Sequence, residues 1–112
     1  MRSFVGCLVL DKQGRVLCQL RDNKPNVAFP GYWVCTPGGE IESGEEPQEA
    51  IRRELFEECG IEVKDLQLYK SFSYPAGEYE GTYHIFLAIL LTPAAMIRCY
   101  EGQRAEMIST SE

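Results

Sequence analysis

The chain has 112 residues, of which 45% are hydrophobic and 25% are charged. This is the composition of an ordinary globular protein, and a chain of this length encloses one hydrophobic core, so we expect a single domain over residues 1–112. Seventeen acidic and eleven basic side chains give a net charge of −6, and no run is rich in lysine or arginine. A surface that binds a nucleic-acid polymer through its phosphates is therefore not expected.

The cysteines and the N-terminal apolar run bear on the cell compartment. Five cysteines are an odd number and no two have C-x-x-C spacing, so neither a disulfide framework nor a cysteine zinc site is expected. The apolar run Phe4–Leu10 is too short to span a bilayer, and polar Asp11, Lys12 and Gln13 follow it where a secretory cleavage site needs small neutral residues. We therefore expect a cytoplasmic protein that makes no membrane contact.

The predicted elements are several strands and one helix. In chain order we expect strands over 4–10 and 16–20 joined as a hairpin, a loop over 21–32, a short strand over 33–36, a helix over 47–59, and strands over 66–74, 82–91 and 106–109. Pro37-Gly38-Gly39 is expected to interrupt regular structure before the helix. Pro47 suits the first helical turn and Gly60 the C-terminal cap. Since strands outnumber helices, the predicted class is α+β with a mixed sheet.

The predicted helix carries carboxylates beside its apolar side. At 100° per residue one stripe is formed by Ile51, Leu55 and Cys59, which would pack on the sheet. Glu54, Glu57 and Glu58 lie within about 100° of arc beside this stripe, while Arg53 points away from them. The three like charges repel one another, and a divalent cation would turn the repulsion into coordination; carboxylate oxygens suit Mg²⁺ or Mn²⁺ rather than Zn²⁺. The alternative is a solvated acidic face that binds no ligand.

One segment of the chain carries a family motif. Residues 39–61 read G-E-I-E-S-G-E-E-P-Q-E-A-I-R-R-E-L-F-E-E-C-G-I, which resembles the Nudix box, G-x5-E-x7-R-E-U-x-E-E-x-G-U with U aliphatic. The matching residues are Gly39, Glu45, Arg53, Glu54, Leu55, Glu57, Glu58, Gly60 and Ile61. The resemblance implies a Nudix α/β/α sandwich with a mixed sheet. It also implies an Mg²⁺-dependent hydrolase, in which Mn²⁺ can replace Mg²⁺. The enzyme would cleave the pyrophosphate linkage of a nucleoside diphosphate joined to another moiety.

The resemblance also assigns a metal site. The side chains of Glu54, Glu57 and Glu58 and the carbonyl of Gly38 match the family's metal ligands. Residues 101–109, E-G-Q-R-A-E-M-I-S, resemble a segment of the nucleotide-sanitising mutator branch, which implies that Glu101 completes the site or acts as the base. The rival carboxylates, both in the predicted turn between the two long strands, are Glu78 and Glu80.

The remaining candidates concern the substrate. Arg53 resembles an arginine that orients a neighbouring carboxylate, for which Glu45 is the best partner. Arg21 is a candidate phosphate contact, and Gly38 and Gly39 allow the backbone to approach a ligand closely. Candidates for stacking on a base are Trp33 and Tyr32, with a core tryptophan as the alternative. Tyr79 lies past the box where dinucleoside-polyphosphate hydrolases tend to carry a tyrosine.

Two expectations concern the C-terminus and the competing class of function. Nudix domains usually close with another helix over the sheet, whereas residues 109–112 read as only its N-cap and first turn, so that helix is expected to be truncated or absent. An exposed sheet face would then favour a homodimer through the strand over 82–91, at Ile85, Leu87, Ile89 and Leu91. The competing function is a non-catalytic Nudix module that binds nucleotides or a partner protein, against which the intact set of ligands argues.

Overall fold

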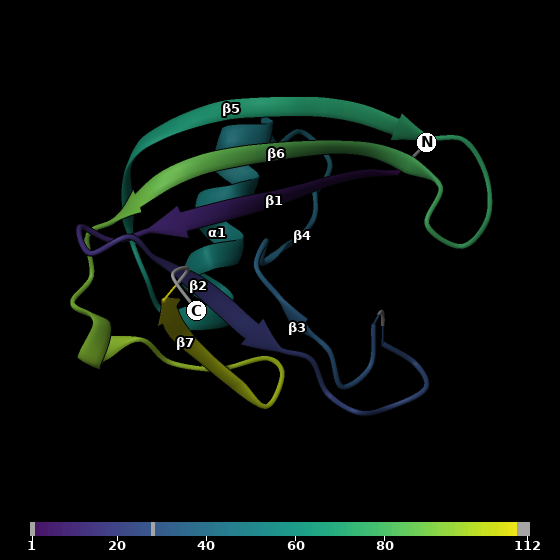
Figure 1. The fold of residues 1–112 in the computed structure, drawn as a ribbon. Helices are drawn as coiled ribbons and strands as arrows, with labels where there is room; N and C mark the ends of the chain where they lie inside the picture. The colour runs from purple at the N-terminus through teal and green to yellow at the C-terminus, as the bar shows by residue number, and fades with distance from the viewer. Residues whose placement is uncertain (1, 28, 110–112) are drawn as a thin grey trace.

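A computed structural model describes residues 2–27 and 29–109 of the chain. In chain order the elements are β1 (Ser3–Leu10), β2 (Arg15–Leu20), β3 (Trp33–Val34), β4 (Gly38–Glu40), α1 (Pro47–Cys59), β5 (Val63–Tyr74), β6 (Gly81–Leu90), the 3₁₀ helix η1 (Ala94–Met96) and β7 (Arg104–Ser109). One sheet has the order β3-β2-β1-β6-β5, with β4 also beside β1 and β7 beside β2 (Figure 1). β1 and β6 are parallel, whereas β1 and β4 are antiparallel, so the predicted α+β class with a mixed sheet is confirmed.

The helix α1 has the bounds that the sequence predicts. Pro47 is the first helical residue, and the N–H of Glu46 before it donates to the carboxylate of Glu49 at 2.8 Å. Gly60 takes the left-handed φ of 67° that ends a helix, and its N–H donates to the carbonyl of Phe56. No helix in the described part of the chain has the length and apolar character needed to cross a bilayer.

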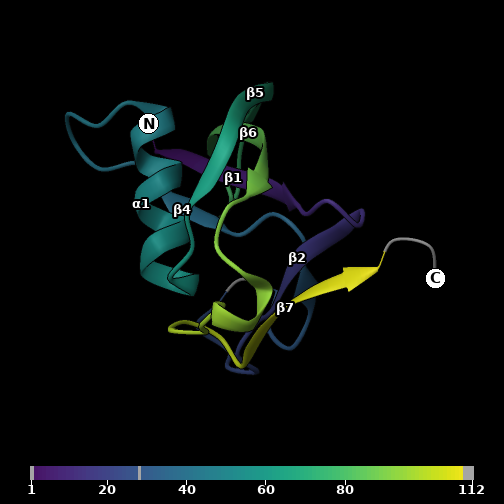
Figure 2. The ribbon, with the colours of Figure 1, turned by 90° about the vertical axis from the view of Figure 1, so that its left-hand side faces the viewer.

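The core lies between α1 and one face of the sheet (Figure 2). Its buried side chains include the predicted helical stripe together with residues of β1 and β6: Ile51, Leu55, Cys59, Val5, Cys7, Val9, Phe86 and Ala88. The opposite face of β6 carries Ile85, Leu87 and Ile89, which are half-buried, and Leu91 is exposed just beyond the strand. The described residues contain no second α-helix, and the predicted homodimer stays a prediction.

The glycine-rich segment before α1 differs from the prediction. The strand expected over 33–36 covers Trp33–Val34, and Gly38–Glu40 forms β4 where the sequence predicts an interruption. β4 pairs with β1 because its glycines have no side chains. A Cβ on Gly38 would lie 2.0 Å from the carbonyl oxygen of Val5, so glycine alone permits this approach.

Three strands also differ in extent or pairing. β1 and β2 pair beside their turn, at Leu10 and Val16, whereas β7 pairs with β2 along its whole length. β5 begins earlier than predicted, at Val63, through an irregularity at Asp65, whose φ of 54° is left-handed. Ser109 is the last residue of β7 rather than a helix N-cap, and the rest of that predicted turn, residues 110–112, lies outside the described residues.

Candidate active site

Arg53 ties the loop before α1 to the carboxylates of the helix. Its Nε and Nη2 donate to the two oxygens of Glu45 at 2.7 and 3.0 Å, and Nη2 also donates to the carbonyl of Glu40 at 3.1 Å. Its Nη1 donates to Glu54 and to Glu57, each at 3.2 Å. The bidentate contact with Glu45 is therefore present. The expectation that Arg53 points away from the carboxylates is wrong, because the long side chain folds along the helix and reaches Glu57 one turn later.

This network fixes charges in place. The hydrogen bonds that Arg53 donates to Glu45 hold the pKa of Glu45 below its usual range and raise the pKa of Arg53. Glu45 also accepts a hydrogen bond from the N–H of Glu42 at 3.0 Å. Arg53 and Glu45 thus remain a charged pair at neutral pH. This pair holds the loop that contains Glu42 and Glu45 against α1.

Glu58 is the most deeply buried carboxylate of the helix. It is 3% exposed, and the ion pairs of Arg53 are made with other carboxylates. Burial raises the pKa of Glu58 to about 9; repulsion from Glu101 and the contact with Glu54 act in the same direction, and Arg21 opposes them. Burial also raises the pKa of Glu54. At neutral pH Glu58 therefore keeps its proton beside Glu54.

A buried glutamine that the sequence does not single out joins Glu58 to the backbone at Tyr100 and Glu101, here called the segment of Glu101. Gln19 is 1% exposed, and its Nε2 donates to the carbonyl of Glu101 at 2.7 Å and to Glu58 at 3.4 Å. The N–H of Tyr100 donates to the carbonyl of Glu58 at 2.7 Å. Glu101 itself is exposed. These bonds place the segment of Glu101 beside Glu58, as the resemblance implies. The sequence pattern that could have identified Gln19 is the alternation of inward and outward side chains along β2, which buries Gln19 on the same face as Leu17.

Gln19 also offers an acceptor to the site. Its Oε1 is buried and has no hydrogen-bond partner in the described part of the chain. Buried acceptors are normally satisfied, and a hydrated cation beside Glu58 would bring water molecules that donate hydrogen bonds. This unpartnered oxygen and the hard carboxylate oxygens fit Mg²⁺ or Mn²⁺.

The glycines of β4 bring the backbone against Glu54. A Cβ on Gly39 would lie 2.4 Å from Oε1 of Glu54, so a larger residue would displace that carboxylate. A cavity of about 440 Å³ opens here, and its lining includes Gly38, Gly39, Gln19 and Arg21. The structure therefore brings together the two glycines and the arginine that the sequence predicts to contact substrate.

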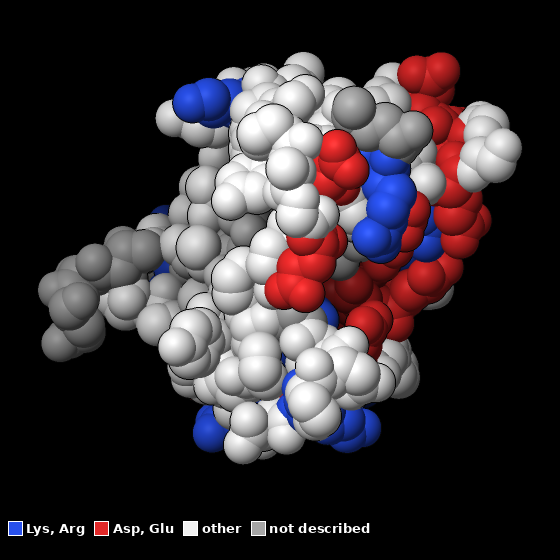
Figure 3. All heavy atoms as spheres, turned by 90° about the vertical axis from the view of Figure 1, so that its right-hand side faces the viewer, with Lys and Arg blue, Asp and Glu red and all other residues white. Residues whose placement is uncertain are grey.

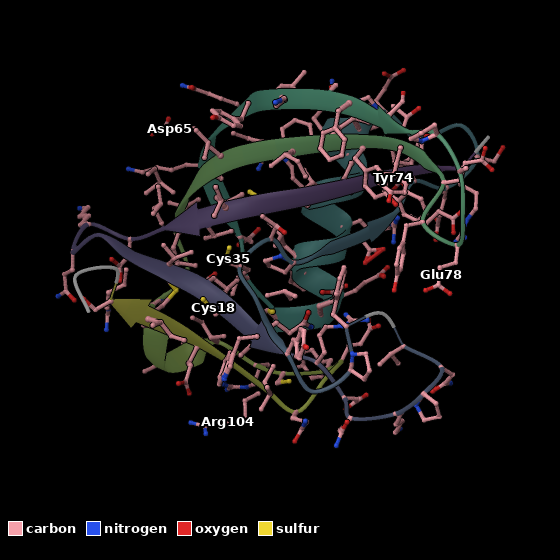
Figure 4. The ribbon with its side chains drawn as sticks, turned by 45° about the vertical axis from the view of Figure 1, so that its right-hand side comes forward. Cys18, Cys35, Asp65, Tyr74, Glu78 and Arg104 are labelled. Carbon is pink, nitrogen blue, oxygen red and sulfur yellow. The ribbon has the colours of Figure 1, made fainter. Side chains whose placement is uncertain are left out.

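The other candidates lie elsewhere. The ring of Trp33 does not line this cavity; it lies beneath the guanidinium of Arg104 at 5.9 Å, near the start of β7. Glu78 lies at the β5–β6 turn, at a different end of the molecule from Arg104 (Figure 4). A stacking role for Trp33 stays a prediction that the cavity does not support.

Acidic and basic side chains lie close together at the site. Figure 3 shows acidic side chains gathered on one side of the molecule, with basic side chains among them in a hollow. In the described ranges no three carboxylate, histidine or cysteine groups already converge on one point where they could hold a metal ion. Arg53 accounts for this, because it draws Glu54 and Glu57 toward itself. Metal binding at the predicted ligands therefore requires Glu57 to turn away from Arg53.

Comparison with known proteins identifies the family. The model of the NUDIX domain family matches residues 2–103. The chain belongs to this family. A NUDIX hydrolase from Nitrosomonas europaea has a similar solved structure, with a TM-score of 0.80 and 25% identity over 99% of this chain and 58% of that chain. A mutator MutT protein from Bacillus halodurans gives a TM-score of 0.68 and 26% identity over 99% and 70%. The Nudix resemblance and the predicted sandwich fold are thereby confirmed.

Two curated relatives carry functional names. An RNA pyrophosphohydrolase of Gluconacetobacter diazotrophicus is 41% identical over 64 residues, which are 54% of this chain and 38% of that protein. The nucleoside triphosphatase NudI of Escherichia coli is 32% identical over 94 residues, which are 77% of this chain and 64% of that protein. The alignments therefore span less than two thirds of either relative.

Proposed function

We propose that this Nudix chain is an Mg²⁺-dependent hydrolase of a nucleoside diphosphate linked to another moiety: a nucleoside triphosphate, a nucleotide sugar or a dinucleoside polyphosphate. The observation that carries the proposal is the buried Glu58 beside the partly exposed Glu54: Glu58 retains a proton next to Gln19, which lines a cavity together with Gly38, Gly39 and Arg21. A cation in place of that proton would remove the repulsion. The names of the two relatives, a pyrophosphohydrolase and a nucleoside triphosphatase, support the same class of reaction.

The proposed metal ligands are the side chains of Glu54, Glu57 and Glu58 and the carbonyl of Gly38. When bound, Mg²⁺ would neutralise phosphate oxygens and lower the pKa of the attacking water, and Mn²⁺ would serve in its place. Glu58 needs to lose its proton before it can bind a cation. Metal affinity is therefore expected to increase with pH.

Other residues of the site position the reactants. Arg53 holds the loop of Glu42 and Glu45 against α1 through its ion pair with Glu45. The guanidinium of Arg53 therefore stays in place when Glu57 turns toward a bound metal ion. Arg21 lines the cavity and supplies positive charge for a phosphate. We assign Glu101 as the group that takes the proton from water, because it is exposed beside Glu58 and its backbone is held by Gln19.

The competing function is a sensor that binds nucleotides without cleaving them. It has no need of carboxylates buried together, because their repulsion costs stability and yields nothing without a metal. We propose a nucleotide-type small molecule rather than RNA as the substrate, although one relative is named for RNA, because the net charge is −6 and acidic groups surround the site. We also propose a cytoplasmic location, since the five cysteines are free thiols.

The test is a hydrolysis assay with nucleoside triphosphates, nucleotide sugars and dinucleoside polyphosphates, with Mg²⁺ or with EDTA. We expect Mg²⁺-dependent cleavage of at least one class, loss of cleavage in Glu58→Gln, and full activity in Glu62→Gln. Glu62 is a suitable control because it is exposed just beyond the end of α1. Nucleotide binding without cleavage of any compound would favour the sensor instead.

A further inference from the structure

Two of the five cysteines lie on neighbouring segments of the sheet. Cys18 is in β2, and Cys35 is the first residue beyond the end of β3, whose Val34 pairs with Gln19 of β2. In an antiparallel pair a step forward along one strand is matched by a step back along the other, so this register places Cys35 opposite Cys18. Figure 4 shows the two cysteines on these adjacent segments.

The position that the two cysteines share brings side chains close together. The N–H of Arg21 donates to the carbonyl of Tyr32 at 2.9 Å, so these two residues are a hydrogen-bonded pair of the same register. Hydrogen-bonded and non-hydrogen-bonded pairs alternate along antiparallel strands, which makes Cys18 and Cys35 a non-hydrogen-bonded pair. In such pairs the Cα atoms are typically about 4.5 Å apart, within the range of roughly 4.4–6.8 Å that a disulfide needs.

The two thiols differ in their access to solvent. Leu17 and Gln19 are buried, and the alternation of β2 turns Cys18 to the other face, where it is half-buried and Cys35 is exposed. Burial raises the pKa of Cys18, and the charges of Cys35 and of Glu106, its pairing partner on β7, raise it further. The two thiols are therefore within electrostatic reach of each other, and Cys35 is the one that meets a dissolved oxidant.

The other three cysteines are less suited to react as a pair. Cys7 and Cys59 are 0% exposed, so a dissolved oxidant does not reach their sulfur atoms. Cys99 is half-buried and lies near Cys59, since the N–H of the adjacent Arg98 donates to the carbonyl of Cys59 at 2.8 Å. A disulfide between these two would need Cys59 to become exposed first.

We propose that Cys18 and Cys35 are a redox-active pair that hydrogen peroxide converts into an intramolecular disulfide. The sulfur of Cys35 attacks one peroxide oxygen and the O–O bond breaks. The other oxygen leaves as water with the thiol proton, and Cys35 becomes a sulfenic acid. The sulfur of Cys18 then attacks that of Cys35, the S–S bond forms and the S–O bond breaks, and the hydroxyl leaves as a second water with the proton of Cys18. The two thiols lose two electrons, which the peroxide gains.

The disulfide fastens a loop at the edge of the cavity over β4. Residues 19–34 lie between the two cysteines, and among them Arg21 and Phe29 line that cavity. The strand that holds this loop to β2 is short, because β3 consists of two residues. A crosslink removes conformational freedom from the unfolded chain, so the oxidised protein is more stable than the reduced protein. Its formation needs neither nucleotide nor metal, so the inference is independent of the proposed function.

The test is oxidation with hydrogen peroxide, alkylation of the remaining thiols, digestion with trypsin and mass spectrometry. Each cysteine falls in a different tryptic peptide. We expect the peptides over residues 16–21 and 22–52 to be joined, and dithiothreitol to separate them. Cys35→Ser should abolish this product and is expected to fold, since Cys35 is exposed. Cys99→Ser is the matched control and should retain the product.

Thermal unfolding gives a second readout. Oxidation should raise the Tm of the wild type by about 10 °C, and it should leave the Tm of Cys35→Ser unchanged. Three results would overturn the inference: a link between the peptides over residues 54–64 and 99–104 in place of the expected one, a disulfide-linked dimer on non-reducing electrophoresis, or oxidation of Cys35 to a sulfinic acid with no crosslink.

Discussion

Replacing Glu58 by glutamine should stabilise the metal-free protein. An unperturbed glutamate has a pKa of 4.5, whereas burial raises that of Glu58 to about 9, so the folded chain retains a proton that the unfolded chain has lost. Over the roughly 2.5 pH units from 4.5 to 7, at about 1.4 kcal/mol each, retaining this proton costs about 3 kcal/mol. Glutamine avoids this cost and keeps an N–H that can donate to Glu54.

The assay is urea unfolding of the wild type, Glu58→Gln and Glu62→Gln in EDTA between pH 5 and pH 8. A group whose pKa is raised on folding loses its stabilising effect as pH increases, so the wild type should become less stable relative to Glu58→Gln across this window. The difference should be small near pH 5 and reach about 3 kcal/mol at pH 7. Adding Mg²⁺ should stabilise the wild type more than Glu58→Gln, because the proposed metal site exists only in the folded chain and includes Glu58.

The reasoning fails on either of two results. Glu58→Gln could be less stable than the wild type at pH 7, which would mean that Glu58 is ionised and favourably paired. Alternatively, the difference between the two proteins could be independent of pH, which would mean that the pKa of Glu58 is not raised by folding. Glu62→Gln should follow the wild type throughout.

Three further substitutions test separate parts of the site. Gly39→Ala puts a methyl group against Glu54 and should lower kcat about a hundredfold in steady-state assays; unchanged kcat would show that Glu54 has room to move. Arg53→Lys loses the bidentate contact with Glu45 and should lower the free energy of unfolding by about 2 kcal/mol in urea; equal stability would mean that one ammonium group replaces the network. Gln19→Met removes the hydrogen bonds to Glu58 and to the carbonyl of Glu101. It should lower kcat about tenfold, while the free energy of unfolding changes by less than about 1 kcal/mol. A larger loss of stability with no further effect on kcat would indicate that Gln19 has a purely structural role.

The local elements could be predicted from the sequence because their signals are local. Pro47 and Gly60 bound α1 through backbone geometry that depends on neighbouring residues alone. The core stripe of α1 follows from its 3.6-residue period. The Nudix motif predicts the pairing of Arg53 with Glu45, which the structure shows, whereas of the three predicted helix carboxylates only Glu58 is buried.

The features that the sequence missed depend on contacts between distant segments. β4 forms because Gly38 can approach Val5 of β1, and no pattern within residues 37–39 contains that information. From the sequence, Gln19 is an ordinary polar residue of a strand. In the structure β7 pairs with β2 at this position and the carbonyl of Glu101 accepts a hydrogen bond from Gln19. The position of Phe29 over Tyr79 depends on the path of a loop whose composition predicts no fixed structure.

The proposed metal site can be tested most directly by titrating Mn²⁺ into the protein and measuring free Mn²⁺ by electron paramagnetic resonance at pH 8. We expect saturable binding by the wild type, binding weakened about tenfold or more in Glu58→Gln, and unchanged binding in Glu62→Gln. Equal Mn²⁺ affinity in the wild type and Glu58→Gln would contradict a metal site built on Glu58 and its neighbouring carboxylates of α1.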